Sequence, residues 1–211
     1  MTTATPTAGS GSPAPRRREN TRARLVEASF GVFVEKGLKP VTVDDLVGAA
    51  GYTRGAFYSN FSSIEEVFFE VFRERGEGML AAASTAMEAV PEEDFTIESI
   101  GSVLDAVRAQ GREWYILHAE FTLLALRDER ARAVLADFSE RFRVRLAAVI
   151  EDVLRRLGRV ADRPTEELAE MVAALHLHAL GQGLVGSAVL GADGISMDTV
   201  SALVLGFSRP A

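Results

Sequence analysis

Apolar residues recur at intervals of three or four positions through almost all of the chain after residue 20, and this spacing limits the fold to packed helices. The clearest stripe contains Leu135, Phe138, Phe142, Leu146 and Val149, which fall on one face of a helix. No segment alternates apolar and polar residues in the manner of a half-buried strand. The sequence therefore predicts an all-α fold of about nine helices.

Glycine and proline residues divide this pattern and set the expected helix ends. Gly37 and Gly51 are natural C-caps, and Thr42 followed by Asp45 is a variant of the capping box. The segment 62–65 fits the same motif, with Ser62 as the cap of the fourth helix. We expect helices at about residues 21–36, 42–50, 53–60, 62–90, 95–110, 113–127, 131–157, 165–190 and 197–207.

The composition excludes several kinds of chemistry. The 211 residues include no cysteine, which rules out disulfides, cysteine-bound zinc, iron–sulfur clusters and thiol nucleophiles. His176 and His178 lie two positions apart, so they diverge by about 200° around a helix and cannot share a metal. The sequence contains no Gly-x-Ser-x-Gly, phosphate-loop or dinucleotide-binding motif. We therefore expect no metal, no cofactor and no enzymatic activity.

The net charge of −7 is divided unevenly along the chain. Residues 1–64 contain eight Lys and Arg against five Asp and Glu, whereas residues 65–211 contain fifteen against twenty-five. A head of charge +3 therefore precedes a body of charge −10. This asymmetry favours a nucleic-acid contact at the basic end.

Composition also divides the chain into three expected segments. Residues 1–18 are rich in Thr, Ala, Pro and Gly, end in three arginines, and are predicted to be a disordered tail. Residues 19–64 contain the short helices, and residues 65–211 contain the long ones. No apolar run is long enough to span a membrane, and the tail lacks the pattern of a signal peptide. We therefore expect a cytoplasmic protein without a membrane partner.

The two short helices joined at Gly51 form the most informative stretch. Small residues at 49–50 permit the helices to approach closely, which is the layout of a helix-turn-helix. The second helix begins with small or polar residues at 53–56, as a helix that enters the DNA major groove requires. Phe57 and Phe61 are spaced to anchor its other face in a core. The stretch predicts a DNA-binding domain, although a helix pair of this kind can also be mere core topology.

Six short motifs follow one another in this region. They are Thr21-Arg-Ala-Arg-Leu25, Phe33-Val-Glu-Lys-Gly37, Val41–Asp45, Ala50-Gly51-Tyr52, Ala56-Phe57-Tyr58 and Asn60-Phe61. Together they resemble the DNA-binding domain of the TetR-family bacterial transcriptional regulators over about residues 20–72. The remainder of the chain resembles that family mainly in its helix pattern.

The resemblance implies that the chain binds a double-stranded DNA operator. Thr42, Thr53 and Tyr58 match positions that contact phosphates. Arg54 is the only long polar side chain among the positions that face base edges, and we expect it to read a base directly. The full set of expected DNA contacts is Thr42, Thr53, Arg54, Gly55, Ala56, Tyr58, Asn60 and Arg22.

One position departs from the family pattern. Many members have a lysine three residues after the position of Phe61, where it meets a phosphate, and this chain has Ile64 instead. Arg22 and the arginines at 16–18 are the candidates to replace that contact from the N-terminal side. The three arginines are alternatively a solvated charge cluster.

The resemblance places an effector pocket among the middle helices. The expected pocket residues are Trp114, His118, Phe121, Phe138, Phe142 and Leu175. Trp114, His118 and Phe121 share one helical face, and an apolar cavity with one titratable group is a usual small-molecule site. The alternative is a packed aromatic core in which His118 meets a backbone carbonyl.

The family pairs its last two long helices across a two-fold axis. The residues expected at this homodimer interface are Gly183, Leu184, Val200, Leu203, Val204 and Phe207. The alternative for each of them is a place in the core of its own chain. The resulting hypothesis is a dimeric repressor that a small apolar molecule releases from an inverted-repeat operator. The alternative function is a DNA-tethered helical interaction module without an effector.

Overall fold

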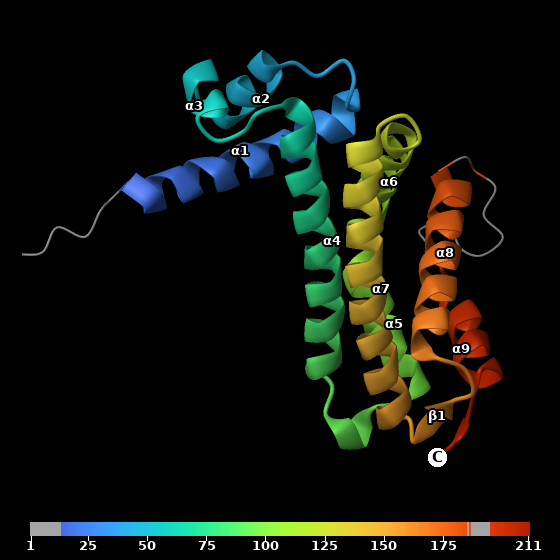
Figure 1. Cartoon of the computed structure of the whole chain (residues 1–211). Coiled ribbons are helices and arrows are strands. Elements are labelled where there is room, and N and C mark those ends of the chain that lie inside the picture. Colours follow the sequence, from blue (N-terminus) through green and yellow to red (C-terminus); the bar gives the residue numbers. More distant parts are fainter. Residues whose placement is uncertain (1–13, 185, 187–194) are drawn as a thin grey trace, which may run out of the picture. The chain divides into compact units, whose positions relative to one another are not determined.

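The structure, a computed structural model of the chain, describes residues 14–184, 186 and 195–211. Its backbone forms two compact units, Met1–Phe68 and Phe69–Ala211. The described residues contain nine α-helices, which confirms the predicted all-α class (Figure 1). Two short helices lie between the first two long helices of the chain, as the sequence predicts.

The first unit contains α1 (Ala14–Lys36), α2 (Val43–Ala50), α3 (Arg54–Tyr58) and the start of α4 (Ile64–Glu88). Its core consists of side chains that are fully buried at helical spacing. They are Leu25, Phe33, Leu46, Phe57, Val67 and Phe68. α1 begins at Ala14, so residues 14–18 are helical rather than part of the predicted tail, and residues 1–13 lie outside the described residues.

The helix ends in this unit follow the predicted caps with one exception. Thr42 and Asp45 form a complete capping box, and Gly51 ends α2 with φ of 70° in the left-handed region. At the start of α4, the Ser63 hydroxyl accepts a hydrogen bond from the Glu66 amide. The predicted cap at Ser62 is therefore one residue early, because Glu66 rather than Glu65 turns back towards the helix start.

The second unit contains the rest of α4 and five further helices. They are α5 (Ile100–Arg108), α6 (Gly111–Ala125), α7 (Glu129–Arg156), α8 (Thr165–Leu184) and α9 (Met197–Gly206). α7 packs against α6 and α8 (Figure 1). The predicted helix at 95–110 begins only at Ile100, after two 3-10 turns at Glu92–Asp94 and Ile97–Ser99. Most of the predicted extension of α8 to residue 190 lies outside the described residues.

A short antiparallel ribbon also contradicts the expectation of a strand-free fold. β1 (Arg159–Ala161) pairs with β2 (Ser208–Pro210), with Val160 opposite Arg209. The Arg159 guanidinium donates to the Ser208 hydroxyl and carbonyl at 2.7 and 2.6 Å. Three-residue strands are too short to carry an alternating pattern, so no sequence signal marked them.

Within the second unit, Arg156 near the end of α7 binds the end of α4. Its guanidinium donates to the carbonyls of Met87 and Val90 at 3.2 and 3.0 Å and to Asp152 at 2.9 Å. It also lies 5.3 Å from the ring centroid of Phe95. α4 ends at Glu88, so this one side chain binds a carbonyl in the last turn of the helix and a second carbonyl just beyond it.

We predict that Arg156→Ala lowers the free energy of unfolding by about 2–3 kcal/mol, because it removes the charged donor from two carbonyls at the end of α4. Urea unfolding at neutral pH measures the change. Arg155→Ala is the matched control, since Arg155 pairs with Glu92 and Asp152 on the exposed side of the same turn. Equal losses in the two variants would contradict this role of Arg156.

Candidate functional site

The turn between α2 and α3 sets the direction of the second helix. Gly51 adopts the left-handed conformation, and the amide of Tyr52 then donates to the carbonyl of Val47 at 2.9 Å. Thr53 is extended, and its hydroxyl accepts from the amide of Ala56 at 3.2 Å, which starts α3 at once. The two helices are therefore joined by a short turn with its own hydrogen bonds.

α3 is anchored from one side and exposed on the other. Phe57 and Phe61 are buried, with their ring centroids 5.9 Å apart, as the spacing predicts. Arg54 and Gly55 are exposed, and the Tyr58 side chain is 60% exposed. This five-residue helix thus presents its N-terminal residues and Tyr58 outward while an aromatic pair holds it in place.

Arg54 has a partner that the sequence reasoning missed. Its Nε lies 3.4 Å from Oδ1 of Asp44 in the first turn of α2, and both side chains are about two-thirds exposed, at 64% and 68%. A pair this exposed contributes little to stability. It does hold the guanidinium on the outer surface of the helix pair. The acidic first turn of α2, one residue before the capping Asp45, was the available sequence signal.

The two threonines expected to contact phosphate are both helix caps. The Thr42 hydroxyl donates to Oδ2 of Asp45 at 2.7 Å, and Lys36 donates to Oδ1 of the same carboxylate at 2.7 Å. The ammonium of Lys36, followed by Thr42, holds the pKa of Asp45 well below its usual range. Thr53 only accepts in its cap, so its hydroxyl hydrogen remains available to an outside acceptor.

Two of the expected DNA contacts instead bind within their own unit. Asn60 is 9% exposed and its Nδ2 donates to the Ala56 carbonyl at 2.8 Å, so it does not point outward. Arg22 donates to the Asn60 carbonyl at 2.9 Å and lies 3.5 Å from a Glu66 oxygen and 4.2 Å above the Phe61 ring. The end of α3 folds back onto α1, which turns both side chains inward.

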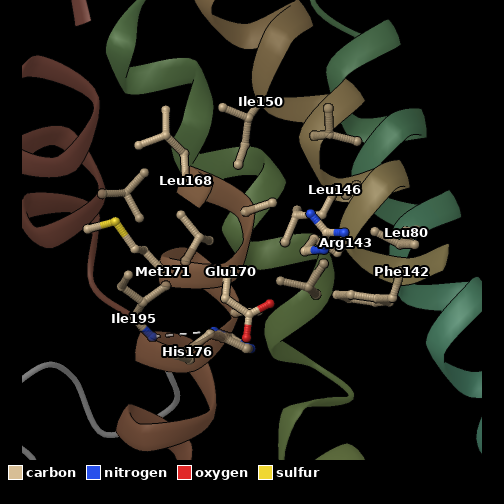
Figure 2. A pocket seen from close by; sticks show the side chains of 18 of the residues that line it. Leu80, Phe142, Arg143, Leu146, Ile150, Leu168, Glu170, Met171, His176 and Ile195 are labelled. Carbon is tan, nitrogen blue, oxygen red and sulfur yellow. Dashed lines mark hydrogen bonds between the residues drawn. The ribbon is translucent and has the colours of Figure 1, made fainter. Parts of the chain in front are cut away.

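The second unit encloses a cavity of about 420 Å³. Figure 2 shows Leu146 and Ile150 of α7 facing Leu168 and Met171 of α8 across it, with Leu80 of α4 at one side. Its lining is predominantly apolar, and aliphatic side chains supply most of it. This size and character are typical of a site for a small organic molecule.

An aromatic cluster forms one wall of the cavity. Phe72 of α4 is almost fully buried, with ring centroids of Trp114 and Phe138 both 4.6 Å away. Trp114 and Phe142 are stacked at 6.3 Å. Trp114, Phe138 and Phe142 line the cavity together with His118, which agrees with four of the six predicted pocket residues.

The other two predicted pocket residues do not line the cavity. Phe121 is fully buried and its ring contacts Phe69 and Phe72 at 5.0 and 4.7 Å, so it lies behind the wall. Leu175 packs instead against a neighbouring core cluster that includes Val153. Helical spacing predicts that Phe121 and Leu175 lie near lining residues of their own helices. It does not predict which neighbouring helix each side chain faces.

Two histidines belong to the wall. Burial lowers the pKa of His118, and it also lowers the pKa of His176, with the positive charge of Arg108 as the second cause. Nδ1 of His176 accepts a long hydrogen bond of 3.5 Å from the Ile195 amide (Figure 2). The sequence reasoning missed His176 as a pocket residue, although it follows Leu168 and Val172 at intervals of four.

Most of the residues predicted for a dimer interface pack within their own chain. Val200 is buried in the core cluster, and Leu203 and Val204 pack against it. Phe207 is half-buried beside the Arg163 guanidinium, and Gly183 is half-buried. Leu184 is 45% exposed in the single chain, as expected for a side chain that only a dimer would bury. α9 packs against α5, and its residues Val200, Leu203 and Val204 line the cavity.

The described residues hold no group of three or more His, Asp or Glu arranged to bind a metal ion. None of the described helices is both long and apolar enough to cross a bilayer. The two candidate sites are the exposed helix pair of the first unit and the apolar cavity of the second.

The helix-turn-helix geometry agrees with comparisons to known proteins. The family model for bacterial regulatory proteins of the TetR family matches residues 25–71. The chain is similar to the HTH-type transcriptional regulator SrpR of Pseudomonas putida, with 40% identity over 57 residues that span 27% of each chain. It is 29% identical to the HTH-type transcriptional repressor Rv1474c of Mycobacterium tuberculosis over 82% of this chain and 84% of that protein.

The fold is also that of solved regulators. A transcriptional regulator of Saccharomonospora viridis, solved in complex with choline, superposes with a TM-score of 0.67 at 16% identity, over 90% of this chain and 99% of that one. The short helices α2 and α3, with α3 anchored by the buried Phe57, form a helix-turn-helix. Residues 25–71 therefore carry the DNA-binding domain of the TetR family, and the chain as a whole is similar to TetR-family transcriptional regulators.

Gly76 of α4 makes room for the aromatic wall. A Cβ at this position would lie 2.8 Å from Cε2 of Phe138 and 3.0 Å from Cη2 of Trp114, which is closer than such atoms approach. We predict that Gly76→Ala costs about 1–3 kcal/mol, because both rings are tightly packed and must shift towards the cavity. Urea unfolding and the emission of Trp114 measure the effect.

Gly78→Ala is the matched control, since a Cβ at Gly78 meets nothing within 4 Å on the same helix. The control should be neutral or slightly stabilising because alanine favours the helix. Similar effects of the two substitutions would show that the wall is not tightly packed against α4.

The low pKa of Asp45 predicts a pH dependence of stability. The ionised carboxylate stabilises the fold fully above its usual pKa of 3.8, and this contribution is lost as the pH falls through the lower pKa of the folded state. Asp45→Asn should therefore be less stable than the wild type at neutral pH, and the difference should shrink in acid. Thermal unfolding from neutral pH to about pH 2 tests this linkage. A difference independent of pH would disprove it.

Proposed function

We propose that this chain is a cytoplasmic, homodimeric DNA-binding repressor that a small molecule releases from an inverted-repeat operator. The observation that carries the proposal is the outward face of α3. Arg54, Gly55 and Tyr58 are exposed there, and the buried Phe57 holds the helix at a fixed depth. A recognition helix needs this combination, because base edges are reached only from a rigid platform.

Each exposed side chain has a role in this proposal. Arg54 leaves Asp44 and donates to a guanine, a contact that contributes about 1–3 kcal/mol of discrimination. Gly55 and Ala56 let the helix approach the base edges. Thr53 and Tyr58 donate hydroxyl hydrogens to phosphates. Thr42 positions α2 as its cap, and Arg22 and Asn60 support the end of α3 without touching DNA.

Two-fold pairing rests on the apolar residues that α8 and α9 leave exposed. Leu184 is 45% exposed at the end of α8, and Leu205 is 55% exposed on α9. A dimer presents two recognition helices to two half-sites about one turn apart, which a single unit cannot do. Leu205 replaces the inward-facing Val200, Leu203 and Val204 in the proposed interface.

The cavity supplies the ligand response. Its wall rests on Phe72, and α4 is one continuous helix that begins in the first unit and ends in the second. A molecule that fits one position of α4 better than another shifts the population of conformers, and only such differential binding regulates DNA affinity. The regulator of Saccharomonospora viridis binds choline in this fold, which supports a small-molecule site here.

DNA duplexes from the region upstream of the gene test the proposal in a binding titration. We predict that Arg54→Ala weakens specific binding about 5- to 150-fold, in line with the loss of one bidentate base contact. Wild-type affinity should fall steeply with salt because phosphate contacts release counterions. Arg141→Ala is the control, since Arg141 is equally exposed and pairs with Asp137 on α7.

Asp44→Asn provides the opposite test. It removes a negative charge beside the DNA and frees Arg54, so we predict tighter binding by at most about fivefold, the scale of an exposed ion pair. Failure to bind any upstream duplex would refute the proposed function. Specific DNA binding that no small molecule affects would favour the interaction module over the ligand-responsive repressor.

A further inference from the structure

The cavity wall contains a buried hydrogen-bonding atom without a partner. Nε2 of His176 is shielded from solvent and makes no hydrogen bond within the described residues. A buried polar group in this state costs about 1–3 kcal/mol relative to a paired one. His176 is one of the residues that line the cavity, so a molecule bound there is a candidate partner for this ring.

The other ring nitrogen decides which kind of partner fits. The Ile195 amide donates to Nδ1 of His176 at 3.5 Å, so the lone pair of Nδ1 faces a hydrogen. A neutral imidazole carries one hydrogen, which must then lie on Nε2. Burial and the charge of Arg108 both lower the pKa of this group, which keeps the ring neutral. Nε2–H is consequently a donor for which the described part of the chain supplies no acceptor.

The charges around the cavity decide against an anionic ligand. Arg143 is the cation of the lining, and its guanidinium already donates to Glu140 at 2.5 Å, with Glu166 and Glu170 also close enough to affect it. Arg108, near His176, is paired with Asp105 at 2.6 Å. Burying a carboxylate in an apolar cavity without a free cation is costly.

We propose that the cavity binds a neutral, mainly apolar molecule whose hydrogen-bond acceptor receives the Nε2 hydrogen of His176. A carbonyl, ester or ether oxygen meets this requirement without breaking the bond to Ile195. The inference rests on the proposed ligand response and names its ligand class. His176 then acts as the specificity-determining residue, while the aromatic wall and the aliphatic lining supply affinity by burial.

The chain carries its own reporter for this test. Trp114 is the only tryptophan and lines the cavity, so its emission reports occupancy in the absence of DNA. The probes are octan-2-one and 2-methyloct-1-ene, which have the same shape except that a methylene group replaces the carbonyl oxygen. Both are titrated against the full chain and against His176→Phe, which keeps a flat ring and removes the donor.

The expected result is a coupling between the probe and the residue. His176→Phe should weaken octan-2-one about five- to tenfold, the scale of one hydrogen bond, and leave the alkene within about twofold. His118→Phe changes the other histidine of the lining and should affect both probes alike. His178→Phe is the surface control, because His178 is exposed on the same helix and does not line the cavity.

Equal effects of His176→Phe on both probes, or absence of binding by either probe, would overturn the inference. If that variant does not fold, nuclear magnetic resonance of the wild type decides, since the ketone alone should shift the Nε2–H signal of His176. A ketone preference that depends on His176, without any effect of the ketone on DNA affinity, would support the inference and contradict the proposed release mechanism. The two failures are thus distinguishable.

Discussion

The burial of Phe72 is the interaction on which the second unit depends. Its ring contacts Trp114 and Phe121 of α6 and Phe138 of α7, so one side chain of α4 fixes two other helices. Such tightly packed aromatic clusters resist small displacements, because each ring occupies the space that its neighbour would need. α8 packs against α6 and α7, and its residues Leu168, Met171 and His176 supply another part of the cavity lining.

The sequence was sufficient for the features that depend on local spacing. The caps at Thr42 and Gly51 and the inward face of α3 follow from residues three or four positions apart, and the structure confirms them. The helical class follows from the same periodicity. These features need no knowledge of which helices meet.

The features that the sequence could not supply depend on which helices meet. Asn60 points inward because Arg22, 38 positions away, holds its carbonyl. Phe121 and Trp114 share a helical face and both contact Phe72 of α4, yet only Trp114 also lines the cavity. Gly181 of α8 accommodates Tyr115 of α6, whose Oη would lie 2.6 Å from an added Cβ, and no spacing within one helix indicates this contact.

The support of α3 from behind has a consequence for how this protein can change. Arg54 and Gly55 contribute nothing to the core, while Phe57 and the Arg22–Asn60 contact hold the helix. Substitutions on the outer face are therefore nearly free of any penalty in folding. Under the proposed function, new target sequences are open to such a chain through mutation of a few surface positions. Selection for stability and selection for sequence preference would then act on separate sets of residues.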